Sequence, residues 1–202
     1  MNRLKKLFQN LILIVLILFI LTSCTGNGTV TPESPGQVKE LYLGVPVVKQ
    51  EKLTWCLPAS VQSVLNYAGM ESVLNYAGMD ITQSEIAKYC MEGNAGSTYI
   101  LANNAEELGI DVDLKNYTLE EIKEEIIKER PPIVTLDYSF TDPENHAYVI
   151  DGFSDIKQEI RGMCPIRGYI TVSYDEFKNI NDQTWGQECD LYLTTSIWPK
   201  DN

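Results

Sequence analysis

The sequence predicts an α+β fold in which helices come first and an antiparallel sheet follows. Before the Pro pair at residues 131–132, apolar residues recur at helical spacing and helix-capping motifs are present. After that pair, short apolar runs are separated by turn residues, which indicates strands. Because helices and strands are segregated along the chain, a doubly wound α/β fold is excluded.

Residues 1–23 are predicted to be a lipoprotein signal peptide. Three cations precede an apolar run at residues 11–21, which is too short to span a bilayer, since a spanning helix needs ~20 apolar residues. The sequence Leu-Thr-Ser-Cys at 21–24 resembles the lipobox of bacterial lipoproteins, in which the Cys is acylated. We therefore expect a lipid on Cys24 that holds the protein, outside the cytoplasm, to a bacterial cell membrane.

Two regions are expected after the signal peptide. Residues 24–40 are rich in Gly, Pro, Ser and Thr and are interpreted as a lipid-anchored flexible tether. Residues 41–202 are then one domain, long enough for a single core.

The helices are predicted from their periodicity and their end signals. A short apolar strand or extended segment at 42–49, limited by Pro46, precedes them. The expected helices are residues 56–68, with Pro58 in the first turn and Gly69 at the stop; residues 83 to about 91, opened by a Thr82/Glu85 capping box; residues 97–108, ended by Gly109; and a helix opened by a Thr118/Glu121 capping box, with Leu119, Ile122 and Ile126 facing inward.

The strands are predicted from apolar runs in the second half of the chain. Residues Ser173 and Glu176 can cap one short helix among them. The expected strands are residues 133–138, 146–153, about 158–163, 169–172 and 190–195.

An eight-residue sequence, SVLNYAGM, occurs at 63–70 and again at 72–79. Nine residues rotate a continuous helix by about 900°, which places the two copies on opposite faces. Only one copy can therefore pack in the same way, and we interpret the other as an extension of the helix or a surface bulge.

The formal charge excludes a protein that follows a nucleic-acid backbone. It is −12 for the whole chain, and removing the three leader cations makes it −15. Nucleic-acid binding requires clustered Lys and Arg. The membrane is an expected partner through the lipid on Cys24, and the oligomeric state is left open.

Cys56 is the candidate nucleophile, because it begins a predicted helix. The helix dipole and the free N–H groups there stabilise a thiolate and can also bind the oxyanion formed on attack. Gln50, six residues upstream, can supply a second oxyanion donor from its amide.

His146 is the candidate base, because it is the one His in the chain. It begins an apolar strand after a loop, where functional residues are often found. We expect Cys56 and His146 to form a thiolate–imidazolium pair.

These residues, with their neighbours, resemble the papain-like cysteine peptidases, and most closely the bacteriocin-leader-processing and C39-like peptidases. The motifs are Gln50 and Trp55-Cys56, then PAS and LNYAG, then HAYVIDGF from His146, then SYDEF followed by Trp, over residues 41–196. The resemblance implies an N-terminal helical lobe followed by an antiparallel sheet, with the active site in the cleft between. It also implies that Cys56 is the nucleophile, His146 the base and Gln50 an oxyanion donor.

The third catalytic position departs from the family pattern of Asp or Asn. A hairpin that turns at Asp155 pairs position 146 with Cys164. Asp151 is predicted to point to the opposite face from His146, and Asp155 to lie at the hairpin tip. The residue that orients the imidazole therefore stays unassigned.

The remaining cysteines could form a disulfide, and the sequence contains no metal-binding motif. Cys90, Cys164 and Cys189 cannot all pair with one another; a disulfide between Cys164 and Cys189 is possible outside the cell, but the sequence does not fix it. One His and no CxxC or HExxH motif predict neither a metal nor another cofactor.

Three functions follow. The first is a membrane-tethered cysteine peptidase that acts on a peptide or protein substrate and forms a thioester on Cys56. The second is an inactive or weak relative that binds peptides, which the Cys at position 164 favours. The third is a transglutaminase-like acyltransferase, in which an amine intercepts the thioester.

Overall fold

The structure is a computed structural model that describes residues 38–71, 81–136, 146–185 and 192–199. The predicted signal peptide, Cys24, the tether up to residue 37 and Cys189 lie outside these residues. The elements in chain order are β1 (Glu40–Tyr42), α2 (Cys56–Glu71), α3 (Gln83–Cys90), β2 (Met91–Glu92), β3 (Ala95–Gly96), α4 (Thr98–Asn103), the 3-10 helix η1 (Ala105–Leu108), β4 (Ile110–Tyr117), α5 (Leu119–Ile127), β5 (Ile133–Leu136), β6 (His146–Ser154), β7 (Glu159–Cys164), β8 (Gly168–Ser173), α6 (Tyr174–Trp185) and β9 (Tyr192–Pro199).

The main sheet has the strand order β4-β9-β5-β6-β7-β8, and every neighbouring pair is antiparallel. Strand β5 pairs with the first half of β6, and the short β1 pairs with its second half. Helices followed by an antiparallel sheet confirm the predicted α+β fold.

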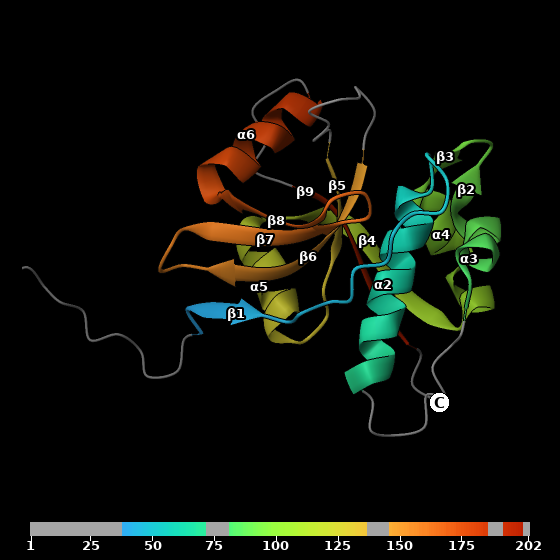
Figure 1. Ribbon diagram of the computed structural model, residues 1–202, viewed down its shortest axis with the longest axis horizontal. Coiled ribbons are helices and arrows are strands. Elements are labelled where there is room, and N and C mark those ends of the chain that lie inside the picture. Colours follow the sequence, from blue (N-terminus) through green and yellow to red (C-terminus); the bar gives the residue numbers. More distant parts are fainter. Residues whose placement is uncertain (1–37, 72–80, 137–145, 186–191, 200–202) are drawn as a thin grey trace, which may run out of the picture. The chain divides into compact units, whose positions relative to one another are not determined.

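Two apolar cores lie on opposite faces of this sheet. Helices α2, α3 and α4 pack with Ala147, Val149 and Met163 on one face. Helices α5 and α6 pack with Tyr148, Ile150 and other residues on the second face. Figure 1 shows α2, α3 and α4 together on one side of the strands and α6 on the other. Even-numbered and odd-numbered residues of the first part of β6 therefore face different helix layers, as expected from strand alternation.

Local sequence signals position the helices correctly. Both predicted capping boxes form: the hydroxyls of Thr82 and Thr118 accept from the N–H groups of Glu85 and Glu121, whose carboxylates accept in return. The Ser173 hydroxyl accepts from the N–H of Glu176 at the start of α6. Each such cap stabilises its helix by about 1 kcal/mol.

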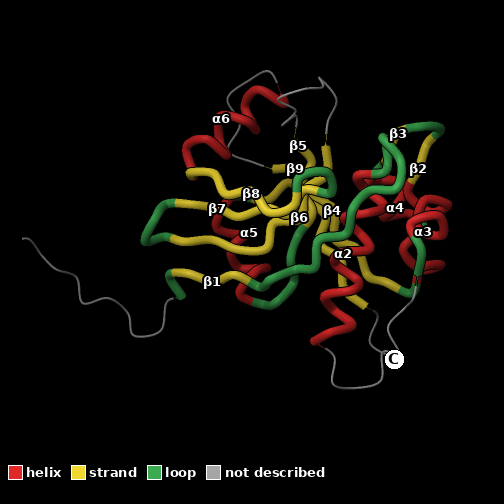
Figure 2. Tube along the Cα trace, viewed as in Figure 1, coloured by secondary structure: helices red, strands yellow, loops and turns green. Residues whose placement is uncertain are grey.

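The structure differs from the predicted elements in several places, including the short β2–β3 pair, which was not predicted. The helix expected at 97–108 is divided into α4 and η1, although Gly109 ends it in the left-handed conformation, with φ 67°. Strand β4 was not predicted. Residues 42–49 form a strand only at their beginning, and the rest is part of the long loop from β1 to α2 (Figure 2).

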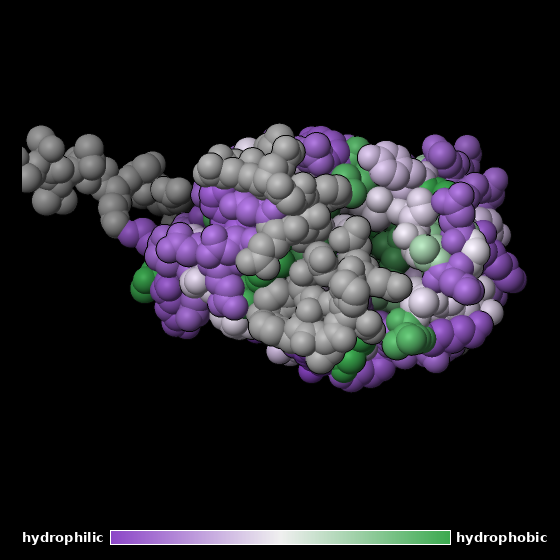
Figure 3. Space-filling model, turned by 90° about the horizontal axis from the view of Figure 1, so that it is seen from above, coloured by the Kyte–Doolittle hydropathy of each residue, from purple (hydrophilic) through white to green (hydrophobic). Residues whose placement is uncertain are grey.

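The first copy of the duplicated sequence is the C-terminal half of α2, where Val64, Leu65 and Tyr67 are buried. The second copy lies outside the described residues. None of the described helices is long and apolar enough to cross a membrane. On the face seen in Figure 3, the described residues are mainly hydrophilic, with scattered hydrophobic ones.

Candidate active site

Cys56 is the first residue of α2 and is half-buried. A turn in which the Trp55 N–H donates to the Lys52 carbonyl (3.0 Å) leads into the helix. The backbone of Leu57 and of Cys56 itself lowers the pKa of the thiol, as expected at a helix start. Burial is the larger effect, however, and the net result is a pKa above that of an ordinary thiol.

Helix α2 holds Cys56 against the beginning of β6. The backbone of Ala147 interacts with the Cys56 thiol, and one helical turn later the Ser60 hydroxyl donates to the Ala147 carbonyl (3.3 Å). Ala147 directly follows His146. The structure therefore brings Cys56 to the residue next to the imidazole, but among the described residues no hydrogen bond joins the Cys56 thiol to the His146 ring.

His146 begins β6 opposite Leu136 of β5. Its ring packs edge-on against Tyr148, with the ring centroids 4.8 Å apart. Burial, together with the nearby Arg167 cation, lowers the pKa of His146 to about 4. With this shift and the raised thiol pKa, Cys56 and His146 are both uncharged near neutral pH. These shifts disfavour the expected thiolate–imidazolium pair, which stays a prediction.

Cys164 also contacts the His146 ring. Its Sγ lies 3.6 Å from Nε2 of the imidazole. The predicted register is nevertheless wrong by two residues: Val149 pairs with Met163, which places Cys164 beside Tyr148. Ser154 pairs with Glu159 at the turn, and a bulge between Ile150 and Gly152 then shifts the strand pairing by one residue. The observed pairing therefore differs from the predicted one by two residues. Because this number is even, the side chains of Cys164 and His146 stay on one face of the sheet.

Neither nearby Asp takes the place beside the imidazole. Asp151 is fully buried, and its carboxylate accepts from Nε (2.9 Å) and Nη2 (2.8 Å) of Arg161. Asp155 accepts from Lys123 Nζ (2.6 Å) and the Tyr174 hydroxyl (2.8 Å). Both carboxylates therefore stabilise the fold.

Gln50 is hydrogen-bonded both to the residue after Cys164 and to the turn before Cys56. Its N–H donates to the Pro165 carbonyl (3.2 Å), beside Cys164. Its side-chain amide donates to the carbonyls of Lys52 (3.0 Å) and Leu53 (2.6 Å), in the turn that leads to Cys56. An oxyanion would therefore compete with these two carbonyls for the Gln50 donors.

Gln83 positions the segment around Gln50, and the sequence did not reveal this role. From the first turn of α3, its buried amide donates to the Lys49 carbonyl (2.7 Å) and accepts from the Glu51 N–H (3.0 Å). The contact of Ser60 with β6 could have been anticipated, because Ser60 lies one helical turn after Cys56 and so on the same face of the helix.

The thiols of Cys56, Cys90 and Cys164 are free. Burial, together with the nearby Cys56, raises the pKa of Cys90 to about 12, so this thiol is inert. In the described ranges, no three His, Cys, Asp or Glu side chains are grouped as metal ligands.

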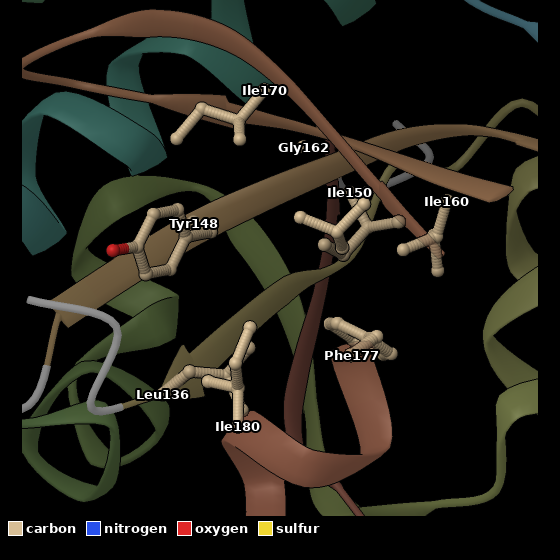
Figure 4. Close-up of a pocket in the computed structure, with 9 residues that line it drawn as sticks. Leu136, Tyr148, Ile150, Ile160, Gly162, Ile170, Phe177 and Ile180 are labelled. Carbon is tan, nitrogen blue, oxygen red and sulfur yellow. The ribbon is translucent and has the colours of Figure 1, made fainter. Parts of the chain in front are cut away.

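An apolar cavity of about 30 Å³ lies between the sheet and α6 (Figure 4). It is lined by Leu136, Tyr148, Ile150, Ile160, Gly162, Ile170, Val172, Phe177 and Ile180. Tyr148 also packs against His146. A volume near that of one water molecule is too small for a substrate side chain, so we treat the cavity as a packing defect.

Comparison with known proteins identifies the fold. The double glycine motif protease from an AMS/PCAT transporter, solved in complex with its leader peptide, superposes with a TM-score of 0.55 at 19% identity, covering 81% of this chain and 100% of that one. A C39-like peptidase from Bacillus anthracis gives a TM-score of 0.58 at 12% identity, covering 82% of this chain and 100% of that one. No curated protein sequence matches the chain.

The family is shown by a sequence model rather than by these distant structures. The model of the Peptidase_C39 like family matches residues 42–188. That range includes Gln50, Cys56, His146 and Cys164, and it confirms the resemblance drawn from the ordered motifs. The chain belongs to the Peptidase_C39 like family.

Proposed function

We propose that this protein is an extracytoplasmic, membrane-tethered cysteine peptidase, with Cys56 as nucleophile, His146 as base and Gln50 as an oxyanion donor. One observation carries the proposal: the half-buried Cys56 thiol begins α2 and contacts the backbone of the residue that follows the one His in the chain. Membership of a C39-like peptidase family supports the same chemistry.

The proton and the acyl group move between these residues. His146 takes the thiol proton as the sulfur attacks the substrate carbonyl, and then gives it to the leaving amine. The remaining thioester on Cys56 is hydrolysed by a water that His146 deprotonates. Backbone N–H groups at the start of α2, with the Gln50 amide once it leaves its present carbonyls, stabilise the oxyanion.

The shifts in pKa of Cys56 and His146 both favour the uncharged form, and this affects how His146 acts as a base. A His146 pKa of about 4 keeps the imidazole unprotonated in mildly acidic solution. Catalysis then requires proton transfer during the attack rather than a preformed ion pair. The His146 ring must also move to contact Cys56, and catalytic hydrogen bonds commonly tighten only when substrate is bound.

A peptide is the proposed substrate. A protein of the same fold binds a leader peptide, and the predicted lipid on Cys24 would restrict this protein to peptides outside the cytoplasm. The acyltransferase alternative uses the same thioester and differs only in the acceptor.

A peptide-binding module without activity is the second candidate, and one observation favours it. Burial moves the pKa of both Cys56 and His146 toward the uncharged form, and no hydrogen bond joins them among the described residues. A binding protein would need neither the thiolate nor the imidazolium.

The test is cleavage of a mixed-sequence peptide library, read as new N-termini by mass spectrometry. We expect Cys56→Ala to abolish cleavage and His146→Gln to lower it by ~100-fold or more. Cys90→Ala, which changes a buried thiol outside the proposed machinery, is the matched control and should cleave like wild type.

The other outcomes separate the candidates. Library peptides that are bound but never cut identify the binding module. Products that carry an added primary amine identify the acyltransferase. Equal cleavage by wild type and Cys56→Ala contradicts the assignment of the nucleophile.

A further inference from the structure

The Cys164 sulfur has three polar neighbours, and two of them are backbone N–H groups. Cys164 ends β7, its thiol is free, and the residue is only 2% exposed. In the turn that leads to β8, the nitrogens of Ile166 and Arg167 each lie 3.4 Å from Sγ. Nε2 of the His146 imidazole lies 3.6 Å from the same sulfur.

The two backbone contacts determine which role the thiol takes toward the imidazole. A backbone N–H can only donate, so the sulfur is the acceptor in both of these contacts. A thiol sulfur has two lone pairs, and a buried thiol keeps its proton near neutral pH. The S–H is therefore the group left for Nε2, and it donates.

The direction of this contact fixes the tautomer of His146. A neutral imidazole has one acceptor nitrogen, because the other nitrogen carries the proton. If the Cys164 S–H donates to Nε2, the ring proton lies on Nδ1. The acceptor nitrogen is then occupied, and His146 cannot take the Cys56 proton until this bond opens.

We propose that Cys164 is an inhibitory positioning residue, whose S–H donates to Nε2 of His146 and holds the ring in the Nδ1–H tautomer. The nearby carboxylates do not compete for Nε2, because Asp151 binds Arg161 and Asp155 binds Lys123. An Asp in the place of Cys164 would have the opposite effect, since a carboxylate accepts from Nε2–H and leaves Nδ1 as the acceptor. The catalytic consequence rests on the proposed function, whereas the tautomer itself does not.

The tautomer can be measured directly, because the chain has a single His. We would label the mature protein with ¹⁵N-histidine, purify it in detergent without a histidine tag, and record both ring nitrogens near neutral pH. The lowered pKa of about 4 keeps the ring neutral there. Wild type should have its proton on Nδ1. Cys164→Ala removes the donor and should increase the Nε2–H share, whereas Cys90→Ala, which also loses a buried thiol, should match wild type.

Two results of this measurement would overturn the proposal. One is a wild-type ring that is protonated on Nε2, and this result needs no variant. The other is a Cys164→Ala ring that keeps the wild-type tautomer. If Cys164→Ala does not fold, Cys164→Val replaces it, because valine is close to cysteine in size and has no donor.

Peptide cleavage measures the inhibitory effect. Cys164→Ala should raise kcat by roughly 2- to 10-fold, the net contribution of one hydrogen bond, with little change in KM. Cys164→Asp should raise kcat at least as much, because its carboxylate leaves Nδ1 free to accept. If Cys164 only filled space, its replacement would not raise kcat.

The two measurements separate this proposal from the peptidase proposal. If wild type holds its proton on Nδ1 but no protein cleaves peptide, the peptidase proposal fails while the positioning role stands. If wild type cleaves and Cys164→Ala changes neither tautomer nor kcat, the positioning role fails alone. A changed tautomer without a rise in kcat would overturn the inhibitory effect.

Discussion

His146 is a buried imidazole that the folded protein holds uncharged. Its pKa falls from 6.5 to about 4, first because burial disfavours the cation and then because of the Arg167 charge. The unfolded chain has no such restriction, so it binds a proton at a higher pH than the folded chain does. This contribution to stability is fully present above pH 6.5 and is lost as the pH falls toward 4.

We therefore predict that the free energy of unfolding of wild type falls more steeply with acid than that of His146→Gln. The His146 contribution to this fall is at most about 3 kcal/mol between the two pKa values. Urea unfolding at a series of pH values on both proteins measures it. Parallel pH profiles would mean that the imidazole is not buried as the structure has it.

The sequence could predict where Cys56 lies but not the net pKa of its thiol. Its place at the start of α2, and the help that backbone groups there give to a thiolate, follow from local pattern. The net pKa does not, because burial is set by how α2 packs on β6. The sequence predicted that Cys164 pairs directly with His146. Their side chains do meet, but the predicted pairing is wrong by two residues, because the turn lies beyond Asp155 and the bulge at Asp151 removes only one residue of that shift.

At the scale of elements, signals confined to a few residues were reliable and long-range pairing was not. The Thr82 and Thr118 capping boxes predicted the starts of α3 and α5. Strand β4 was missed although its alternating apolar and polar residues are typical of a half-buried strand; the sequence does not show its partner, β9, about 80 residues later. Gln83 was missed because the groups it binds, at Lys49 and Glu51, are distant in sequence.

The duplicated sequence offers a matched pair of substitutions in one element. Leu65, in the first copy, is 7% exposed in the core of α2, and Leu74 is its counterpart nine residues later. The spacing places the copies on opposite faces of a continuous helix, so one copy alone can make these contacts.

We predict that Leu65→Ala lowers the free energy of unfolding by about 2–5 kcal/mol, as for other buried leucines. Leu74→Ala should lower it by less than about 0.5 kcal/mol, the usual range for a side chain outside the core. Thermal or urea unfolding of the two variants compares them directly. Equal losses would show that both copies contribute to the core.

At the scale of the whole molecule, the predicted tether would set where the domain works. Its predicted end at residue 40 is wrong, because β1 begins at Glu40; residues 25–39 are then a predicted coil that spans roughly 20 Å on average. The charge of −15 without the leader cations repels an anionic membrane surface rather than binding it. We therefore propose that membrane attachment comes from a lipid on Cys24 rather than from electrostatics.

This argument predicts how attachment responds to salt and to mutation. Burying acyl chains is insensitive to ionic strength, since it depends on about 0.8 kcal/mol for each CH₂ group. Wild-type protein should therefore stay with membranes in high salt and enter the detergent phase on Triton X-114 partitioning. Cys24→Ala should appear in the aqueous phase if its leader is still cleaved, or keep the leader and stay membrane-bound, and intact mass distinguishes the two forms. Release of wild type by salt alone, or a wild-type mature mass without lipid, would contradict the anchor and leave the peptidase domain without a tethered position.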